Sequence, residues 1–207
     1  MKKKTLLIAV AAIALAVVTA ASVTVAWLNA ESDTVTNTFT YGNIAISLDE
    51  TSEYAQATQI TGGMKFDKVI PGDTISKEPV ITVETGSELC YVYVLVTNNL
   101  VLDNLANAVT YDIITDATQP EYWTVVKTID NSVLYRYSAT IDASTAAKTV
   151  TVFENVSFAG ALTVADVNVL AAIEDGIVIK AYAHQAEHAL RDDADTAATT
   201  WATNNAN

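Results

Sequence analysis

The stretch LCYVYVLVT, residues 89–97, decides the fold class of this chain. Successive side chains of a strand point to opposite faces, so the stretch divides into two sets. Both sets are apolar: one holds Leu89, Tyr91, Tyr93 and Leu95, and the other holds Cys90, Val92, Val94 and Val96. A strand with no polar face is typical of a sheet that is covered on both sides. We therefore expect residues 89–97 to form a central strand.

Segments on both sides of this stretch alternate between polar and apolar residues, which predicts further strands. Residues 33–41 (DTVTNTFTY) place threonine on one face, and at Gly42-Asn43 the apolar phase flips, which predicts a bend. Residues 122–129 (YWTVVKTI) and 133–141 (VLYRYSATI) flank a turn at Asn131-Ser132 and predict an antiparallel hairpin. Two more strands are expected at TVTVFENVSF, residues 149–158, and IVIKAYAHQ, residues 177–185.

A structural turn is predicted at Pro71-Gly72-Asp73, where proline presets the first dihedral angle and glycine admits the second. The polar residues 49–63 before it are expected to form a loop, followed by the apolar segment 64–70 (MKFDKVI). After the turn, residues 74–84 (TISKEPVITVE) predict a strand that leads into the central one.

Helical patterns are few. Residues 162–176 (LTVADVNVLAAIEDG) predict a helix with Thr163 as its N-cap and Gly176 as its end, and a short helix is expected around residues 99–108 (NLVLDNLANA). Residues 191–207 are polar apart from Trp201 and are expected to be a tail with at most a short helix. Residues 42–190 therefore predict one all-β domain, an antiparallel β-sandwich of jelly-roll-like kind with one or two short helical insertions.

The first residues have the pattern of a signal peptide. MKKK is a basic start, TLLIAVAAIALAVV is an unbroken apolar run, and TAASVTVA supplies small residues for cleavage. We place the cleavage after Ala26, which makes residues 1–26 the signal peptide and Trp27 the first residue of the mature protein. The alternative is an uncleaved membrane anchor, since the apolar stretch 5–28 is long enough to span a bilayer.

The mature chain is strongly acidic. Removing residues 1–26 takes away three lysines and no acid, which lowers the formal net charge from −13 to −16. Nucleic acid and anionic lipid are poor partners for such a chain, because phosphate contacts need clustered Lys and Arg. The chain has one cysteine, Cys90, so no intramolecular disulfide can form. Its apolar neighbours indicate a buried thiol rather than a reactive one.

One motif favours a protease. Residues 184–188 read H-Q-A-E-H, which matches the H-x-x-E-H signature of inverted zinc peptidases. Two histidines four residues apart can share a zinc ion from one face of a helix, but not from a strand. Here the strand alternation of residues 177–185 reaches His184, and the residues after His188 contain Asp but no Glu for a third ligand. We therefore predict no metal, no cofactor and no enzymatic activity.

Several stretches resemble the TasA, camelysin and spore-coat-associated protein N family of Gram-positive bacteria. AWLNAESDTVTNTFTYGNIAISL resembles the region that follows the signal peptide in this family. VIPGDTISKEPVITVETGSELCYVYV resembles its P-G-D turn, second turn and apolar strand, LYRYSATID with TVFENVSF resembles its aromatic hairpin and following strand, and IVIKAYAHQAE resembles its closing strand. These matches keep the family's order and cover most of the mature chain.

The resemblance implies a secreted protein that is processed by a dedicated signal peptidase. It implies a jelly-roll-like fold and self-assembly into extracellular biofilm-matrix or cell-surface fibres, in which the freed N-terminal segment of one subunit adds as a strand to the next. The donor segment would be residues 27–41, whose contact residues would be Trp27, Leu28, Val35, Phe39 and Tyr41. The partner would be the protein itself or a related fibre subunit, and the membrane would be contacted only through an uncleaved signal segment.

Three alternatives remain open at this point. Residues 27–41 could be an ordinary first strand that pairs within its own domain. The protein could be a secreted metalloendopeptidase, as camelysin of the same family has been described, or an accessory or anchoring subunit of another protein's fibre.

Overall fold

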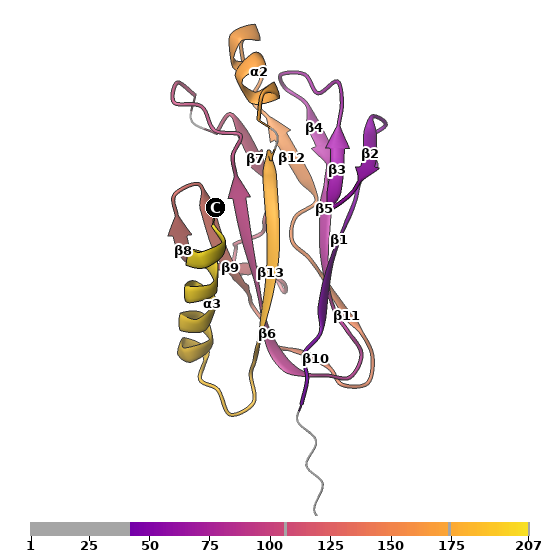
Figure 1. Cartoon of the computed structure of the whole chain (residues 1–207), viewed down its shortest axis with the longest axis vertical. Helices are drawn as coiled ribbons and strands as arrows, with labels where there is room; N and C mark the ends of the chain where they lie inside the picture. The colour runs from indigo at the N-terminus through magenta and orange to yellow at the C-terminus, as the bar shows by residue number, and fades with distance from the viewer. Residues whose placement is uncertain (1–41, 106, 174, 207) are drawn as a thin grey trace, which may run out of the picture. The chain divides into compact units, whose positions relative to one another are not determined.

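Strands dominate the structure. Figure 1 shows a computed structural model of the chain, which describes residues 42–105, 107–173 and 175–206. These residues form thirteen strands and two helices, and all the strand pairs among them are antiparallel. The predicted all-β class is confirmed. Within this part of the chain no helix has the length and apolar character needed to cross a membrane.

The first layer of strands has β5 (Glu78–Val83) near its centre. This strand pairs with β1 (Ile46–Thr51) on one side and with β11 (Lys148–Thr151) on the other. A second group of three strands continues this layer, in which β12 (Asn155–Phe158) pairs with β4 (Thr74–Ser76) on one side and β7 (Val109–Tyr111) on the other. The N–H of Lys77 donates to the carbonyl of Glu154 where the two groups of strands meet. Residues 74–84 and 149–158, each predicted as one strand, are therefore both interrupted near this point.

The second layer is built on β6 (Ser87–Asn98), which includes the stretch 89–97. It lies between β13 (Ile177–Gln185) on one side and β9 (Ser132–Tyr137) with β10 (Ile141–Ala143) on the other. The predicted central position of this strand is confirmed. The predicted hairpin is also present, with β8 (Trp123–Ile129) paired to β9 through a turn at Asp130 and Asn131, one residue earlier than predicted.

The main core lies between the two layers and explains one apolar face of β6. Four side chains of this face are completely buried: Cys90, Val92, Val94 and Val96. The opposite face of β6 is also covered, because Tyr93 and Leu95 are buried in a second cluster with three alanines from the C-terminal helix. The two apolar faces of residues 89–97 are therefore both buried, one in the main core and the other under the C-terminal helix.

The C-terminal residues form a long helix, so the prediction of a polar tail with at most a short helix is wrong. Helix α3 (Arg191–Asn205) lies along the outer face of the second layer (Figure 1). Its contact face consists of Ala194, Ala198 and Ala202, which are fully buried, and the ring of Trp201 stacks on Tyr182 at 5.1 Å. Alanine carries little apolar surface but is the best helix former, which is why this face does not read as amphipathic in the sequence.

Polar contacts hold α3 in place on the sheet. The hydroxyl of Tyr93 donates to Asp195 Oδ1 at 2.8 Å, and Arg136 forms an ion pair with the same carboxylate. Lys180 Nζ donates to the carbonyl of Asn205 at 2.8 Å. Tyr93, Arg136 and Lys180 come from three different strands that are far apart in the sequence. Together they fix the helix to the sheet at more than one point along its length.

Of the two predicted internal helices, only one forms. Helix α2 (Val164–Ala171) begins at the predicted N-cap Thr163, whose side chain forms a reciprocal capping box with Asp166, and it ends before Gly176. The described residues of the segment 99–108 are not helical, so that prediction is wrong. Asn98 Oδ1 accepts from the N–H of Leu100, and Asn107 adopts a left-handed φ of 58°. Asparagine side chains compete with helical hydrogen bonds in this way.

The region predicted as a polar loop contains a hairpin. Strands β2 (Ala57–Ile60) and β3 (Gly63–Phe66) pair only with each other among the described residues. Gly62, with a φ of 85°, forms the turn between them. Threonine and glutamine occupy the two central positions of β2, so no apolar alternation marked this strand in the sequence.

Candidate functional site

The outer edge of β13 is the first feature of the candidate site. The N–H of Asn99 donates to Gly176 O and the N–H of Ala186 donates to Leu89 O, so both residue pairs are hydrogen-bonded pairs of the antiparallel register. In such a ladder hydrogen-bonded and non-hydrogen-bonded pairs alternate. The even-numbered residues of β13 therefore direct their backbone groups to β6. The backbone N–H and C=O groups that point outward belong to Ile177, Ile179, Ala181, Ala183 and Gln185.

This edge is open within the described part of the chain. None of the five outward-pointing residues has a backbone partner there, although the Gln185 carbonyl lies 2.9 Å from the side-chain Nδ1 of His184. In the same part of the chain β1, the edge strand of the first layer, pairs only with β5. A row of unpaired backbone groups on an edge strand is a template for another strand. The side chains of these residues would continue the core under an added strand, because Ile177, Ile179, Ala181 and Ala183 pack against the main core. Of the five, only Gln185 is exposed.

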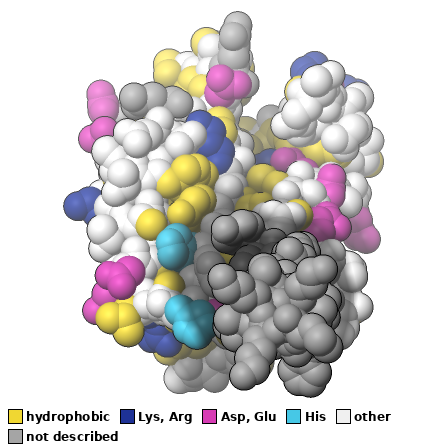
Figure 2. Space-filling model, turned by 60° about the horizontal axis from the view of Figure 1, so that its bottom comes forward, with side chains coloured by type: hydrophobic (Ala, Val, Ile, Leu, Met, Phe, Trp, Pro, Cys, Tyr) yellow, Lys and Arg dark blue, Asp and Glu magenta, His cyan; other side chains and the backbone are white. Residues whose placement is uncertain are grey.

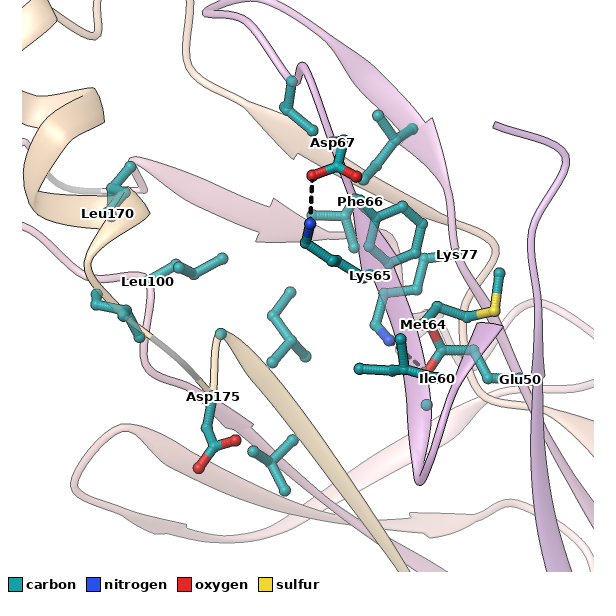
Figure 3. Close-up of a pocket in the computed structure, with 18 of the residues that line it drawn as sticks. Glu50, Ile60, Met64, Lys65, Phe66, Asp67, Lys77, Leu100, Leu170 and Asp175 are labelled. Atoms are coloured by element: carbon teal, nitrogen blue, oxygen red, sulfur yellow. Dashed lines mark ion pairs between the residues drawn. The ribbon is translucent and has the colours of Figure 1, made fainter. Parts of the chain in front are cut away.

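An open cleft of about 1120 Å³ lies beside this edge and is the second feature of the site. It is lined by β1, the beginning of β13, the β2–β3 hairpin and helix α2 (Figure 3). Its apolar lining comes from both layers and includes Leu48, Ile75, Pro79, Val156, Phe158, Leu162, Leu170, Ile177 and Ile179. Where β1 and the beginning of β13 line the cleft, the side of the molecule thus offers apolar surface from both layers.

A buried ion pair lies in the wall of the cleft. Lys77 Nζ is 2.6 Å from Glu50 Oε2, and the two side chains are only 8% and 14% exposed. The ammonium group also lies 5.7 Å from the centre of the Phe66 ring. Burial lowers the pKa of Lys77, while the hydrogen bond to Glu50 and its charge oppose that shift. The other carboxylate oxygen, Glu50 Oε1, is buried without a hydrogen-bond partner in the described structure.

The sequence reasoning missed this ion pair, although a signal was present. Lys77 falls in the same phase as Ile75, Ile81 and Val83, all of which are buried. Glu50 likewise follows Ile46 and Leu48 in the apolar phase of β1. One charge of each sign in the buried phase of two strands indicates that the strands are neighbours and that the charges meet, because an unpaired buried charge is costly.

The predicted turn lies at the border of the cleft. The N–H of Asp73 donates to Ile70 O, and Pro71 and Gly72 occupy the two central positions. Gly72 has a φ of 90°, a conformation that favours glycine, and its N–H donates to Phe158 O at 3.1 Å. The Asp73 carboxylate accepts from the N–H of Ile70 at 3.0 Å. The turn therefore ties the chain after the β2–β3 hairpin to the end of β12.

The two histidines of the H-x-x-E-H motif do not lie on a helix. His184 lies on β13, as predicted, and its Nδ1 is 2.9 Å from the carbonyl of Gln185. His188 follows the strand in a turn with a φ of 59°. Both reach the surface, as the cyan side chains of Figure 2 show. In the described residues no group of three or more His, Cys, Asp or Glu side chains is placed to hold a metal ion.

Cys90 is completely buried in the main core. Burial raises the pKa of its thiol to about 11, so the thiolate is scarce at neutral pH. This agrees with its interpretation as a small core residue.

The remaining predicted site residues lie outside the described part of the chain. They are the cleavage-site residues Ala26 and Trp27 and the donor-strand residues Leu28, Val35, Phe39 and Tyr41, with Trp27 belonging to both sets. The open edge of β13 and the cleft beside it were not predicted.

The chain was compared with known proteins. No protein family, no curated protein and no solved structure matches it.

Proposed function

We propose that this protein is an exported structural protein that polymerises into extracellular matrix or cell-surface fibres. In this proposal the N-terminal segment 27–41 of one copy adds as a strand to the open edge of β13 in the next copy. The two layers of strands would then correspond to the jelly-roll-like sandwich of the TasA, camelysin and spore-coat-associated protein N family, which several stretches of the sequence resemble.

The observation that carries the proposal is the outer edge of β13, with five outward-pointing residues that lack backbone partners in the described part. In strand addition, main-chain hydrogen bonds provide affinity and alternate side chains fill pockets. The cleft beside this edge supplies apolar surface on the side where such side chains would enter. Val35, Phe39 and Tyr41 have the required spacing in the donor segment.

The mode of contact determines what assembles. A donor segment at one place and an acceptor edge at another make a heterologous contact, which need not close on itself and can extend as a filament. Related fibre subunits with a similar donor segment could enter the same edge. In line with the signal peptide and the family resemblance, the protein would act outside a Gram-positive cell after a dedicated signal peptidase has freed residue 27.

The test compares two forms of the protein: one beginning at Trp27 and one lacking residues 27–41. Both are incubated over a range of concentrations and imaged by electron microscopy, with sedimentation to measure the polymerised fraction. We expect filaments from the first form only, and a synthetic peptide of residues 27–41 should inhibit their growth. Monomers under all conditions, together with casein cleavage that a chelator abolishes, would refute the proposal in favour of a protease. Polymerisation only with a second protein would instead indicate an accessory subunit.

A further inference from the structure

The β2–β3 hairpin is attached to the rest of the structure only at its base, as far as backbone hydrogen bonds of the described residues go. Its strands pair with each other, and the two remaining bonds run from Ala57 N–H to Tyr54 O and from Asp67 N–H to Gln56 O. No ladder therefore connects the hairpin to either layer in this part of the chain. Its position over the cleft depends on side-chain contacts.

Those contacts are made over the Lys77–Glu50 ion pair, as Figure 3 shows. The Phe66 ring lies 5.7 Å from Lys77 Nζ, and a Cβ placed on Gly63 would be 3.9 Å from Glu50 Oε2. Met64 and Ile60 come from the same hairpin and line the same cavity. The hairpin thus helps to keep water from two opposite charges that the layers below it supply.

This closed arrangement is not electrostatically ideal. A buried ion pair has to offset the desolvation of both charges, and it does so only when the remaining polar atoms are also hydrogen-bonded. Among the described residues Glu50 Oε1 has no hydrogen-bond partner. Opening the hairpin would let water reach that oxygen and the ammonium group, so the energy of the pair opposes closure instead of adding to it.

We infer that the β2–β3 hairpin is a flap over the acceptor cleft, and that the buried Lys77–Glu50 pair keeps it able to open and admit the donor segment of a second copy. The identity of the occupant rests on the proposed function; the flap does not. The ion pair sets how readily the flap opens. An apolar pair at the same two positions closes the flap, and a single unpaired charge opens it.

Hydrogen exchange of the mature protein measures the flap directly. The variants are Lys77→Met, which leaves Glu50 unpaired, and Glu50→Leu with Lys77→Met, which makes both positions apolar. The matched control is Lys65→Met, because Lys65 forms a 2.8 Å ion pair with Asp67 on the same hairpin but with both side chains at least half exposed. Amides of β6 report global unfolding in the same experiment and separate it from local opening.

We expect amides of residues 57–66 to exchange at least about tenfold faster in Lys77→Met, since removing one partner of a buried pair leaves an uncompensated charge. The double variant should exchange no faster than the wild type, and Lys65→Met should match the wild type. Equal hairpin exchange in all four proteins overturns the inference. So do hairpin amides that are unprotected in the wild type, or acceleration that equals that of β6.

The polymerisation rate tests the link to assembly. Lys77→Met should polymerise faster than the wild type, and the double variant should polymerise more slowly or at an equal rate. If exchange changes as expected but the rates do not, the flap does not gate the cleft, and strand addition is unaffected. If even the wild type does not polymerise, the proposed function fails, while hydrogen exchange still decides whether the hairpin is a flap.

Discussion

Ala181→Pro is the most direct test of the open edge. Ala181 lies in the middle of β13 and its N–H points away from β6, so proline removes no bond of the β6–β13 ladder. Proline is tolerated on the outer side of an edge strand, and Lys180 before it is already extended, as proline requires. The monomer should therefore fold, while the edge loses one of its five outward-pointing N–H donors.

The expected effect follows from the number of bonds lost. One backbone hydrogen bond contributes about 1 kcal/mol net, and each added subunit would form that bond once. Because 1.4 kcal/mol corresponds to a tenfold change in affinity, the critical concentration for polymerisation should rise about fivefold. Any steric conflict between the proline ring and the incoming strand increases the effect further.

The assay is sedimentation of polymer from the protein beginning at Trp27, with the soluble concentration at equilibrium as the readout. Ala181→Gly is the control, since it changes the same position and keeps the N–H. Circular dichroism and a thermal melt establish that both variants fold. An unchanged critical concentration in a folded Ala181→Pro variant would show that another surface accepts the strand.

Three further predictions concern the monomer. Trp201→Ala should lower the free energy of unfolding by about 2 kcal/mol, less than for a fully buried tryptophan, because the ring is half-buried against Tyr182; urea denaturation followed by circular dichroism measures it, and a change near zero would mean that α3 contributes little. Cys90 should react with a thiol reagent at pH 8 only after addition of urea, since burial raises its pKa to about 11, and rapid labelling of the native protein would contradict its burial. The Asp166 carboxylate has a lowered pKa, mainly because it accepts from the Thr163 hydroxyl and N–H, so its contribution is present above the ordinary pKa of 3.8 and is lost as pH falls through the lowered value. Asp166→Asn should therefore reduce the decrease in melting temperature between pH 7 and pH 3, and an identical decrease would mean that this carboxylate is not linked to folding.

The central strand and its main neighbours were predictable because their signal is local. In residues 89–97 every side chain up to the final threonine is apolar, and only a strand covered on both faces accommodates that pattern. The β8–β9 hairpin and the capping box at Thr163 are likewise encoded within a few residues. Each of these elements can be predicted from neighbouring residues alone, without knowledge of any tertiary contact.

Helix α3 and the cleft were not predictable in the same way. The helix is recognised as part of the core only when Ala194, Ala198 and Ala202 are placed against Tyr93 and Leu134, which lie far away in the sequence. The cleft depends on two strand edges and a hairpin whose sequence has no clear alternation. The helix predicted at residues 99–108 is wrong for a different reason: the Asn98 side chain bonds the N–H of Leu100 and the carbonyl of Val109, at the two ends of the segment.

Helix α3 also limits how this sheet can associate with others. Lamination of sheets, as in cross-β fibrils, needs bare faces whose side chains interdigitate. One face of the second layer is turned to the main core, and the other is occupied by an alanine-lined helix fixed by Arg136, Tyr93 and Lys180. Growth along the edge of β13 would therefore proceed without thickening through this layer, which favours slender, uniform filaments over stacked aggregates.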